Sequence, residues 1–242
     1  MQIEGRNTVI ETLRAKKQIK VIYIEKDINI DEKISKIRKL ASKQGIEVRY
    51  KPKKFLNKIS QTKSHQGVIA LKAKEVDIGF KHYLDKLIED GTQPFFIYVR
   101  EALYEHNLGA VIRTAEAAGL DGVVIPPKTR LTAQTVRAAT GATEHIPVIK
   151  EGLFNSIKFS RQQGLKIVGI EVSGKNDYFD EDLTGPLLLI IGGEDRPLSE
   201  AIIKKTDTIV RIPQKGKVNS LNMSVAAAIV IYDKIRQESL TG

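Results

Sequence analysis

From Pro94 to the C-terminus, short apolar segments alternate with segments of helical periodicity. Strands are predicted at Phe95–Val99, Gly122–Ile125, Ile146–Ile149, Lys166–Val172, Leu187–Ile191 and Thr208–Ile212. Their apolar residues are mostly continuous rather than alternating, which is typical of strands that are buried on both faces of a parallel sheet. Because helical patterns lie between most of these strands, the sequence predicts a doubly wound α/β fold.

The first 75 residues have a smaller α/β pattern of their own. Helices are predicted at Thr8–Ala15 and Asp31–Gln44, and strands at Val21–Glu25, Glu47–Tyr50 and Val68–Ala73. Residues 76–93 mix acidic and apolar residues, and Gly91 and Pro94 lie near the end of this stretch. We therefore predict a domain at 1–75, a linker at 76–93 and a larger domain at 94–242.

The excess of positive charge lies in the first third of the chain. The net charge is +10, and residues 1–75 contain 19 basic and 8 acidic residues, whereas residues 76–242 contain 20 and 21. A localised positive field of this kind attracts a polyanion, and RNA is the natural candidate. The alternative is a solvated lysine-rich surface with no nucleic-acid partner.

Several functional classes are excluded by what the sequence lacks. There is no cysteine, so disulfides and thiol nucleophiles are absent. The N-terminal residues contain no signal-peptide pattern, and the longest apolar runs are too short to cross a bilayer, so we expect a cytoplasmic protein. Neither a G-x-G-x-x-G turn nor a P-loop motif is present, which argues against those modes of nucleotide binding.

Three polar segments follow predicted strands of the larger domain. They are Asn107-Leu-Gly-Ala-Val-Ile-Arg113, Ile190-Ile-Gly-Gly-Glu194 and Ile212-Pro-Gln-Lys-Gly-Lys-Val-Asn-Ser-Leu-Asn222. Asn107 is suited to cap a helix that begins near Leu108, and paired glycines let a backbone turn sharply against a flat ligand. Ser220 and Asn222 are both good helix caps, but only one of them can cap the following helix. Simple caps, turns and surface ion pairs are the alternatives to a functional role.

Taken together and in this order, the three segments resemble the signature motifs of the SpoU/TrmH-like branch of the SPOUT RNA methyltransferases. The segments Ile3–Glu11 and Ser64–Val68 are similar to an N-terminal RNA-binding domain of ribosomal-protein type that many relatives carry. The resemblance implies a C-terminal parallel-sheet domain with a deep trefoil knot, S-adenosylmethionine as cofactor, no metal, and a homodimer. It also implies transfer of a methyl group to a ribose 2′-hydroxyl of RNA.

The resemblance further implies roles for individual residues. Catalytic roles fall to Arg113, Asn107, Glu194, Ser220 and Asn222, and cofactor-binding roles to Gly192, Gly193, Ile212, Leu221, Thr140 and Gly141. A free guanidine is a poor base because its pKa exceeds about 12. Arg113 therefore either acts as an unusual base or holds a phosphate and stabilises a forming alkoxide, and both roles stay open here. For the loop that contains Thr140 and Gly141, a tight turn is an equal alternative.

Two short segments depart from the family pattern, so other functions stay open as alternatives. Tyr104-Glu105 stands where members commonly have Asp-Pro, and Glu194-Asp-Arg-Pro-Leu198 stands where they usually have Glu-Gly-x-Gly-Leu. Large-subunit ribosomal RNA is the first choice of substrate, because tRNA-specific relatives often lack the basic N-terminal domain. The alternatives are a tRNA 2′-O-methyltransferase, a base methyltransferase of the wider SPOUT group, and a catalytically inactive RNA-binding factor of ribosome assembly.

Overall fold

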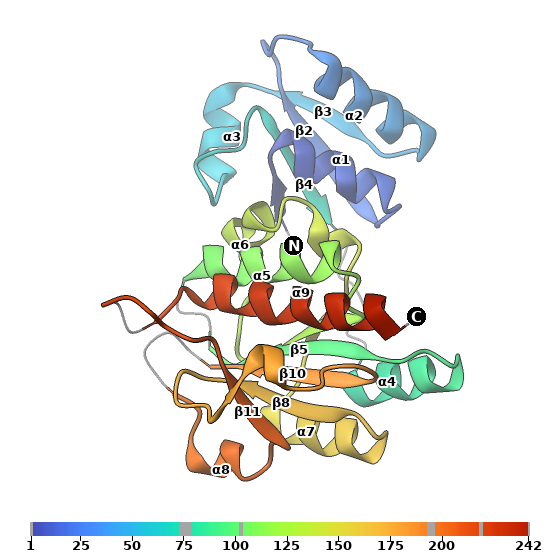
Figure 1. Cartoon of the computed structure of the whole chain (residues 1–242). Helices are drawn as coiled ribbons and strands as arrows, with labels where there is room; N and C mark the ends of the chain where they lie inside the picture. Colours follow the sequence, from blue (N-terminus) through green and yellow to red (C-terminus); the bar gives the residue numbers. More distant parts are fainter. Residues whose placement is uncertain (1, 73–78, 102–103, 193–196, 218–219, 242) are drawn as a thin grey trace. The chain divides into compact units, whose positions relative to one another are not determined.

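The computed structural model describes residues 2–72, 79–101, 104–192, 197–217 and 220–241, which belong to two compact units (Figure 1). The first unit comprises Met1–Val76 together with Leu131–His145, and the second comprises Asp77–Arg130 together with Ile146–Gly242. Each unit has a hydrophobic core of its own.

The first unit contains a mixed four-stranded sheet with the order β1-β4-β2-β3. Its strands are β1 (Gln2–Glu4), β2 (Ile19–Glu25), β3 (Val48–Lys51) and β4 (Val68–Lys72). Strand β4 is antiparallel to both of its neighbours, whereas β2 and β3 are parallel. The predicted α/β pattern is thus confirmed, although the sequence did not predict the short strand β1.

Three helices precede or follow these strands, namely α1 (Arg6–Arg14), α2 (Glu32–Lys43) and α3 (Lys53–Ile59). Helix α2 begins where the sequence indicated, because the Asp31 side chain accepts a hydrogen bond from the N–H of Ile34 over 2.9 Å. Its apolar residues at three- and four-residue spacing, Ile34, Ile37 and Ala41, are fully buried in the core. Helix α3 was not predicted.

A segment from the middle of the chain folds with this first unit. Residues 131–145 form α6 (Ala133–Ala138) and the 3₁₀ turn η1 (Ala142–Glu144). The Glu144 carboxylate and the Lys72 ammonium lie 2.9 Å apart, and both side chains are almost completely buried. Gly141 has a φ of 102°, and a Cβ placed on it would lie 2.7 Å from Glu11. From sequence, this segment had been assigned to the larger domain.

The second unit is built on a seven-stranded sheet in which all paired strands are parallel, as the sequence predicts. The strand order is β7-β6-β5-β10-β8-β11-β9. The strands are β5 (Phe95–Val99), β6 (Gly122–Ile125), β7 (Val148–Lys150), β8 (Lys166–Ile170), β9 (Asn176–Asp177), β10 (Leu187–Ile191) and β11 (Thr208–Arg211). Every residue of β5 and β10 is buried, which explains their continuous apolar sequences.

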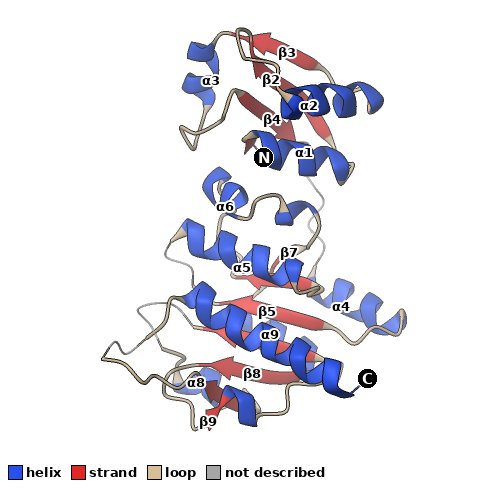
Figure 2. Cartoon of the chain, turned by 45° about the horizontal axis from the view of Figure 1, so that its top comes forward, coloured by secondary structure: helices blue, strands red, loops and turns tan. Residues whose placement is uncertain are grey.

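Helices cover both faces of this sheet. Helices α5 (Glu105–Ala117) and α9 (Met223–Thr241) lie side by side (Figures 1 and 2). The core that includes Phe96 is completed by α4 (Phe80–Glu89) and α7 (Leu153–Gln162), and α8 (Glu200–Ile203) adds Ile202 to it. Helix α4 lies within the range predicted as a linker, yet its Phe80 and Leu84 are fully buried. No helix in the described part of the chain is long and apolar enough to cross a membrane.

Candidate active site

A cavity of about 110 Å³ opens at the carboxyl ends of three neighbouring strands of the second unit. Its walls come from the last residues of β8 and β10, from the residues that follow β8, β10 and β11, and from the start of α9. They are Ile170, Glu171, Val172, Ile191, Gly192, Ile212, Gln214, Ser220, Leu221, Met223 and Ala226. Ligands of open α/β sheets bind outside the carboxyl ends of the strands, so this cavity lies where a cofactor is expected.

The structure brings four of the predicted site residues together in this cavity, namely Gly192, Ile212, Ser220 and Leu221. They come from the second and third polar segments of the sequence. Gly193 and Glu194, which were predicted beside them, lie outside the described residues. The lining is mostly apolar, and it includes a glycine, which has no side chain to keep a ligand from the backbone, so it suits the flat and largely apolar face of a nucleoside.

The side chains of Asn107, in the first polar segment, and Asn222, in the third, contact each other. The side-chain amide of Asn222 donates a hydrogen bond to Oδ1 of Asn107 over 3.1 Å. Asn107 is buried with 3% of its surface exposed, whereas Asn222 is exposed. The expectation that Asn107 caps a helix starting near Leu108 is wrong, because α5 already begins at Glu105 with Tyr104 as its N-cap. Asn107 therefore lies in the first turn of α5 and accepts a hydrogen bond from the residue that precedes α9.

Asn222, rather than Ser220, caps helix α9. Its Oδ1 accepts hydrogen bonds from the backbone N–H of Ser224 over 2.9 Å and from the Ser224 hydroxyl over 2.6 Å. Its backbone carbonyl accepts from the N–H of Ala226, as the last residue before a helix does. Ser220 is exposed and lines the cavity, and no described residue forms a hydrogen bond with its hydroxyl.

Arg113 lies on the exposed side of α5, about two turns after Asn107. Within the described part of the chain, no hydrogen bond or ion pair engages its guanidinium group. The neighbouring residues Val111, Ile112 and Ala115 are fully buried and anchor the helix. The side chain is thus presented to solvent from a rigid element, which suits a group that binds a phosphate.

Two side chains outside the three polar segments hold the backbone next to the cavity. Glu171, directly after β8, accepts a hydrogen bond from the N–H of Leu198 over 2.9 Å. Arg100, directly after β5, donates from Nη1 to the carbonyl oxygen of Pro197 over 3.0 Å. The only available signal was their position at the carboxyl ends of predicted strands, where ligand-binding residues of such sheets gather.

Tyr98 is the residue of the second unit whose acidity is most clearly perturbed among the described residues. Burial and then the nearby Glu151 carboxylate raise the pKa of Tyr98 to about 12. Its hydroxyl donates to the carbonyl oxygen of Glu151 over 3.1 Å. Tyr98 is therefore a neutral hydrogen-bond donor within the core and is unsuited to be a base.

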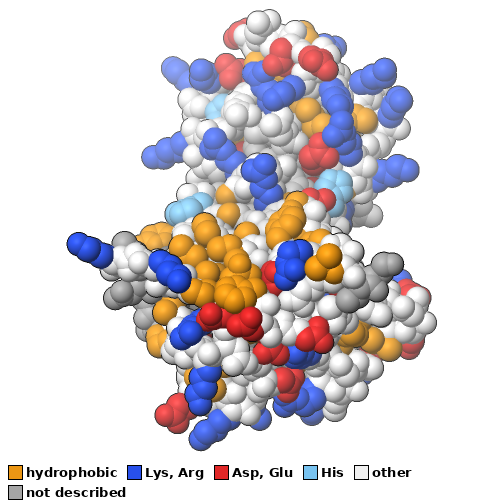
Figure 3. Space-filling model, in the orientation of Figure 1, with side chains coloured by type: hydrophobic (Ala, Val, Ile, Leu, Met, Phe, Trp, Pro, Cys, Tyr) orange, Lys and Arg blue, Asp and Glu red, His pale blue; other side chains and the backbone are white. Residues whose placement is uncertain are grey.

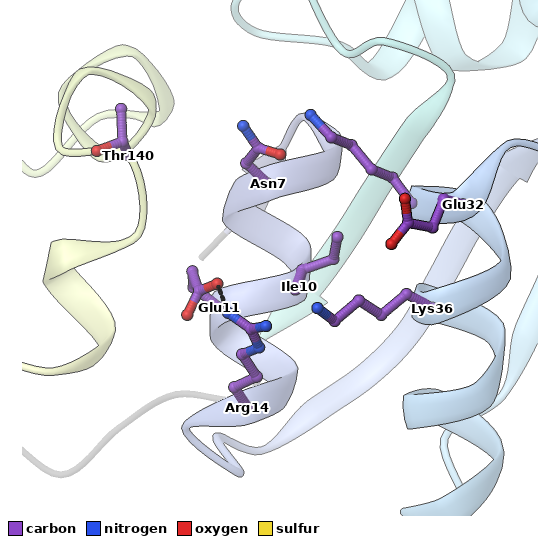
Figure 4. A pocket seen from close by; sticks show the side chains of 8 residues that line it. Asn7, Ile10, Glu11, Arg14, Glu32, Lys36 and Thr140 are labelled. Carbon is purple, nitrogen blue, oxygen red and sulfur yellow. Dashed lines mark hydrogen bonds and ion pairs between the residues drawn. The ribbon is translucent and has the colours of Figure 1, made fainter.

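Thr140 and Gly141, which were predicted to bind the cofactor, do not line the cavity. They belong to the first unit, where Thr140 borders a separate pocket of about 390 Å³ (Figure 4). This pocket lies beside α1 and α2, and its charged lining consists of Arg14, Lys33, Lys36, Glu11 and Glu32. Arg14 and Glu11 form an ion pair at 2.6 Å. Three cations around one pocket can contact the phosphates of a nucleic acid.

Comparisons with known protein families cover both units. Residues 94–232 match the family described as the SpoU rRNA Methylase family. Residues 2–75 match the family described as RNA 2′-O ribose methyltransferase substrate binding. The first match spans more than half of the chain, and the second lies entirely within the first unit.

Similar proteins and structures extend over nearly the whole chain. The YacO protein of Bacillus subtilis, assigned to the TrmH family of tRNA/rRNA methyltransferases, is 34% identical over 98% of this chain and 96% of its own. The structure of the SpoU methyltransferase AviRb from Streptomyces viridochromogenes in complex with AdoMet matches with a TM-score of 0.83 at 22% identity, covering 99% of this chain and 90% of that one. An AdoMet-bound rRNA methyltransferase from Sinorhizobium meliloti matches with a TM-score of 0.79 at 23% identity, covering 97% and 86%. The two solved structures show the same fold.

Proposed function

The chain belongs to the SpoU rRNA methylase family and is an S-adenosylmethionine-dependent RNA 2′-O ribose methyltransferase, and we propose that its substrate is large-subunit ribosomal RNA. The observation that carries this proposal is the N-terminal substrate-binding unit, which holds the excess of positive charge of the chain. A separate basic domain suits a large structured RNA, which is recognised by shape as well as by unpaired bases. The cytoplasm is the compartment that this substrate implies.

The cavity at the carboxyl ends of β8, β10 and β11 is the proposed donor site. Its apolar walls and Gly192 fit an adenosine group, and Ile212 and Leu221 would hold that group. S-adenosylmethionine supplies an activated methyl group with a good leaving group, so the protein mainly has to position the ribose hydroxyl. Ser220 and Asn222 would face this hydroxyl. The deep trefoil knot that is typical of the family is part of the same proposal.

Arg113 is proposed to stabilise charge rather than to remove the proton itself. A ribose hydroxyl is a weak nucleophile until its proton is shared or removed. Arg113 would bind the phosphate next to the target ribose and stabilise the forming alkoxide, and the proton would leave by way of that phosphate. Its exposed position on α5, without an ion pair to any described residue, supports this role. Asn107 and Asn222 would keep α5 and α9 in register with each other.

We further propose that two copies of the chain pair through α5 and α9. Figure 3 shows hydrophobic side chains gathered over the region where these helices lie. On α9, Val225 and Tyr232 keep 46% and 49% of their surface exposed, and Tyr104 before α5 keeps 55%. An apolar surface of this kind on neighbouring helices is typical of a subunit interface. A second copy is the expected occupant, as the resemblance to the family implies.

The test is transfer of labelled methyl groups from S-adenosylmethionine to unmodified RNA. Protein-free ribosomal RNA, bulk tRNA and precursor ribosomal particles are offered separately, and reactions without the protein give the background. Label in ribosomal RNA at one alkali-resistant linkage is the expected result, because a 2′-O-methyl group blocks alkaline cleavage. Label in tRNA alone would overturn the choice of ribosomal RNA. Label that is recovered in a base-methylated nucleoside after complete nuclease digestion would overturn methylation of the ribose.

A further inference from the structure

Glu171 places a negative charge in a cavity whose other described lining side chains are uncharged. The remaining walls consist of aliphatic side chains, Gly192, Gln214, Ser220 and Met223. Glu171 lies outside all three signature segments, and the methyl transfer described above gives it no role. A carboxylate at the edge of a largely apolar cavity is costly unless it is held by hydrogen bonds or meets a cationic ligand.

Backbone amides hold this carboxylate in place. Oε2 accepts from the N–H of Leu198 over 2.9 Å, and Oε1 accepts from the N–H of Val172 over 3.0 Å. The N–H of Glu171 itself donates to the carbonyl oxygen of Val210 on β11 over 3.0 Å. The Leu198 side chain is buried in the core, so the amide that donates to Oε2 is itself held in place.

These contacts orient the carboxylate but do not neutralise it. Its two partners are amides, and no described residue forms an ion pair with it. Because Glu171 itself lines the cavity, a ligand held against this wall lies within the Debye length of about 8 Å at physiological salt and interacts with the charge.

The two nucleosides that the cavity must handle differ mainly in charge. The methyl donor S-adenosylmethionine carries a positively charged sulfonium, whereas the product S-adenosylhomocysteine has a neutral thioether at the same position. On the basis of the proposed donor site, we propose that Glu171 is a specificity-determining residue that makes the cavity bind the charged donor in preference to the neutral product. The attraction is lost with the methyl group, so it favours exchange of spent product for fresh donor.

Calorimetric titration of the full-length protein with each nucleoside, without RNA, tests this assignment. In Glu171→Gln, the preference for S-adenosylmethionine over S-adenosylhomocysteine should fall about tenfold, mostly through weaker binding of the donor. Glu171→Asp keeps the charge and should keep the preference even where both affinities fall. Glu200→Gln removes the same charge from an exposed position of the second unit and should leave the ratio unchanged.

The ratio of affinities separates the proposed role from a purely structural one. If Glu171 only held Leu198, its substitution would weaken the binding of both nucleosides by the same factor. A parallel loss of affinity or an unchanged ratio of affinities in Glu171→Gln therefore overturns the proposal. If Glu171→Gln does not fold, Glu171→Ala, in which water can reach the freed amides, gives the same comparison. If the unmodified protein binds neither nucleoside, the cavity is not a donor site, and the proposed function fails together with this inference.

Discussion

The side-chain amide of Asn222 lies 3.1 Å from Oδ1 of Asn107 and donates a hydrogen bond to it across 115 residues of sequence. Asn107 belongs to the first turn of α5, and Asn222 immediately precedes α9. One bond therefore joins two of the three signature segments. Since Oδ1 of Asn222 also caps α9, the same side chain stabilises a helix and fixes its partner.

The two functions of Asn222 are separable by substitution. Asn222→Ala removes the cap and the bond to Asn107, so we expect a loss of about 1–2 kcal/mol of stability in urea unfolding. Asn222→Asp keeps an acceptor for the cap but cannot donate to Asn107. The Asn222→Asp protein should keep most of its stability. Its single-turnover rate of methyl transfer should fall about tenfold, because the residues of the site are misplaced. Gln162→Ala, at an exposed position of α7, is the control and should change neither quantity.

Arg113→Ala should reduce the single-turnover methyl-transfer rate by about 10²–10³-fold, because a donor that stabilises developing charge is lost. The affinity for S-adenosylmethionine should stay the same, since Arg113 does not line the cavity. Arg113→Lys keeps the charge without the planar fork and should recover only part of the rate. Lys158→Ala, which removes an exposed cation from α7, is the control. A near-normal rate for Arg113→Ala on bound RNA would show that Arg113 is not catalytic.

Tyr232→Asp should convert a dimer into a monomer, because it places a charge in the centre of the apolar surface of α9. Sedimentation equilibrium measures the mass directly. Phe154→Asp is the control, since Phe154 is equally exposed, at 49%, but lies on α7. Unmodified protein that is monomeric at micromolar concentration would contradict the proposed pairing.

Glu144→Gln should destabilise the first unit by up to about 3–5 kcal/mol, because a neutral amide replaces the carboxylate that lies 2.9 Å from the buried Lys72 ammonium. The double substitution Lys72→Met with Glu144→Leu removes both charges and should recover most of this loss. Chemical unfolding monitored within the first unit measures the effect. Glu47→Gln breaks an exposed pair with Arg49 and should have little effect. A small loss for Glu144→Gln would contradict this account of the pair.

Glu4 should make the first unit sensitive to acid. Burial alone would raise the pKa of Glu4, but hydrogen bonds from Thr62, Gln61 and Ser60 outweigh it and leave the pKa below its ordinary value of 4.5. Since the folded pKa is depressed, this contribution to stability is complete above pH 4.5 and is lost as the pH falls through the folded pKa. Glu4→Gln should cost about 1–3 kcal/mol at pH 7, and the difference should shrink in more acidic urea titrations. A constant difference would contradict this account.

The alternation of apolar strands and helices determined the class of the second unit. The predicted bounds of β5, β6 and β10 agree with the structure residue for residue, because central strands of a parallel sheet are apolar throughout their length. Helix α2 could also be predicted from the sequence, because its cap and its buried face are encoded by residues close together in the chain. The three signature segments, met in order, were enough to indicate the family.

Only the tertiary structure decided which of these polar residues meet. It placed the caps of α5 and α9 at Tyr104 and Asn222, joined Asn107 to Asn222, and brought Glu171 into the wall of the cavity that we propose as the donor site. It also assigned residues 131–145 to the first unit, where a buried ion pair joins them to β4. The local sequence encodes periodicity and turn chemistry, whereas these contacts join residues that are distant in the chain. They form only when strand ends converge at one edge of a sheet and buried charges find their partners.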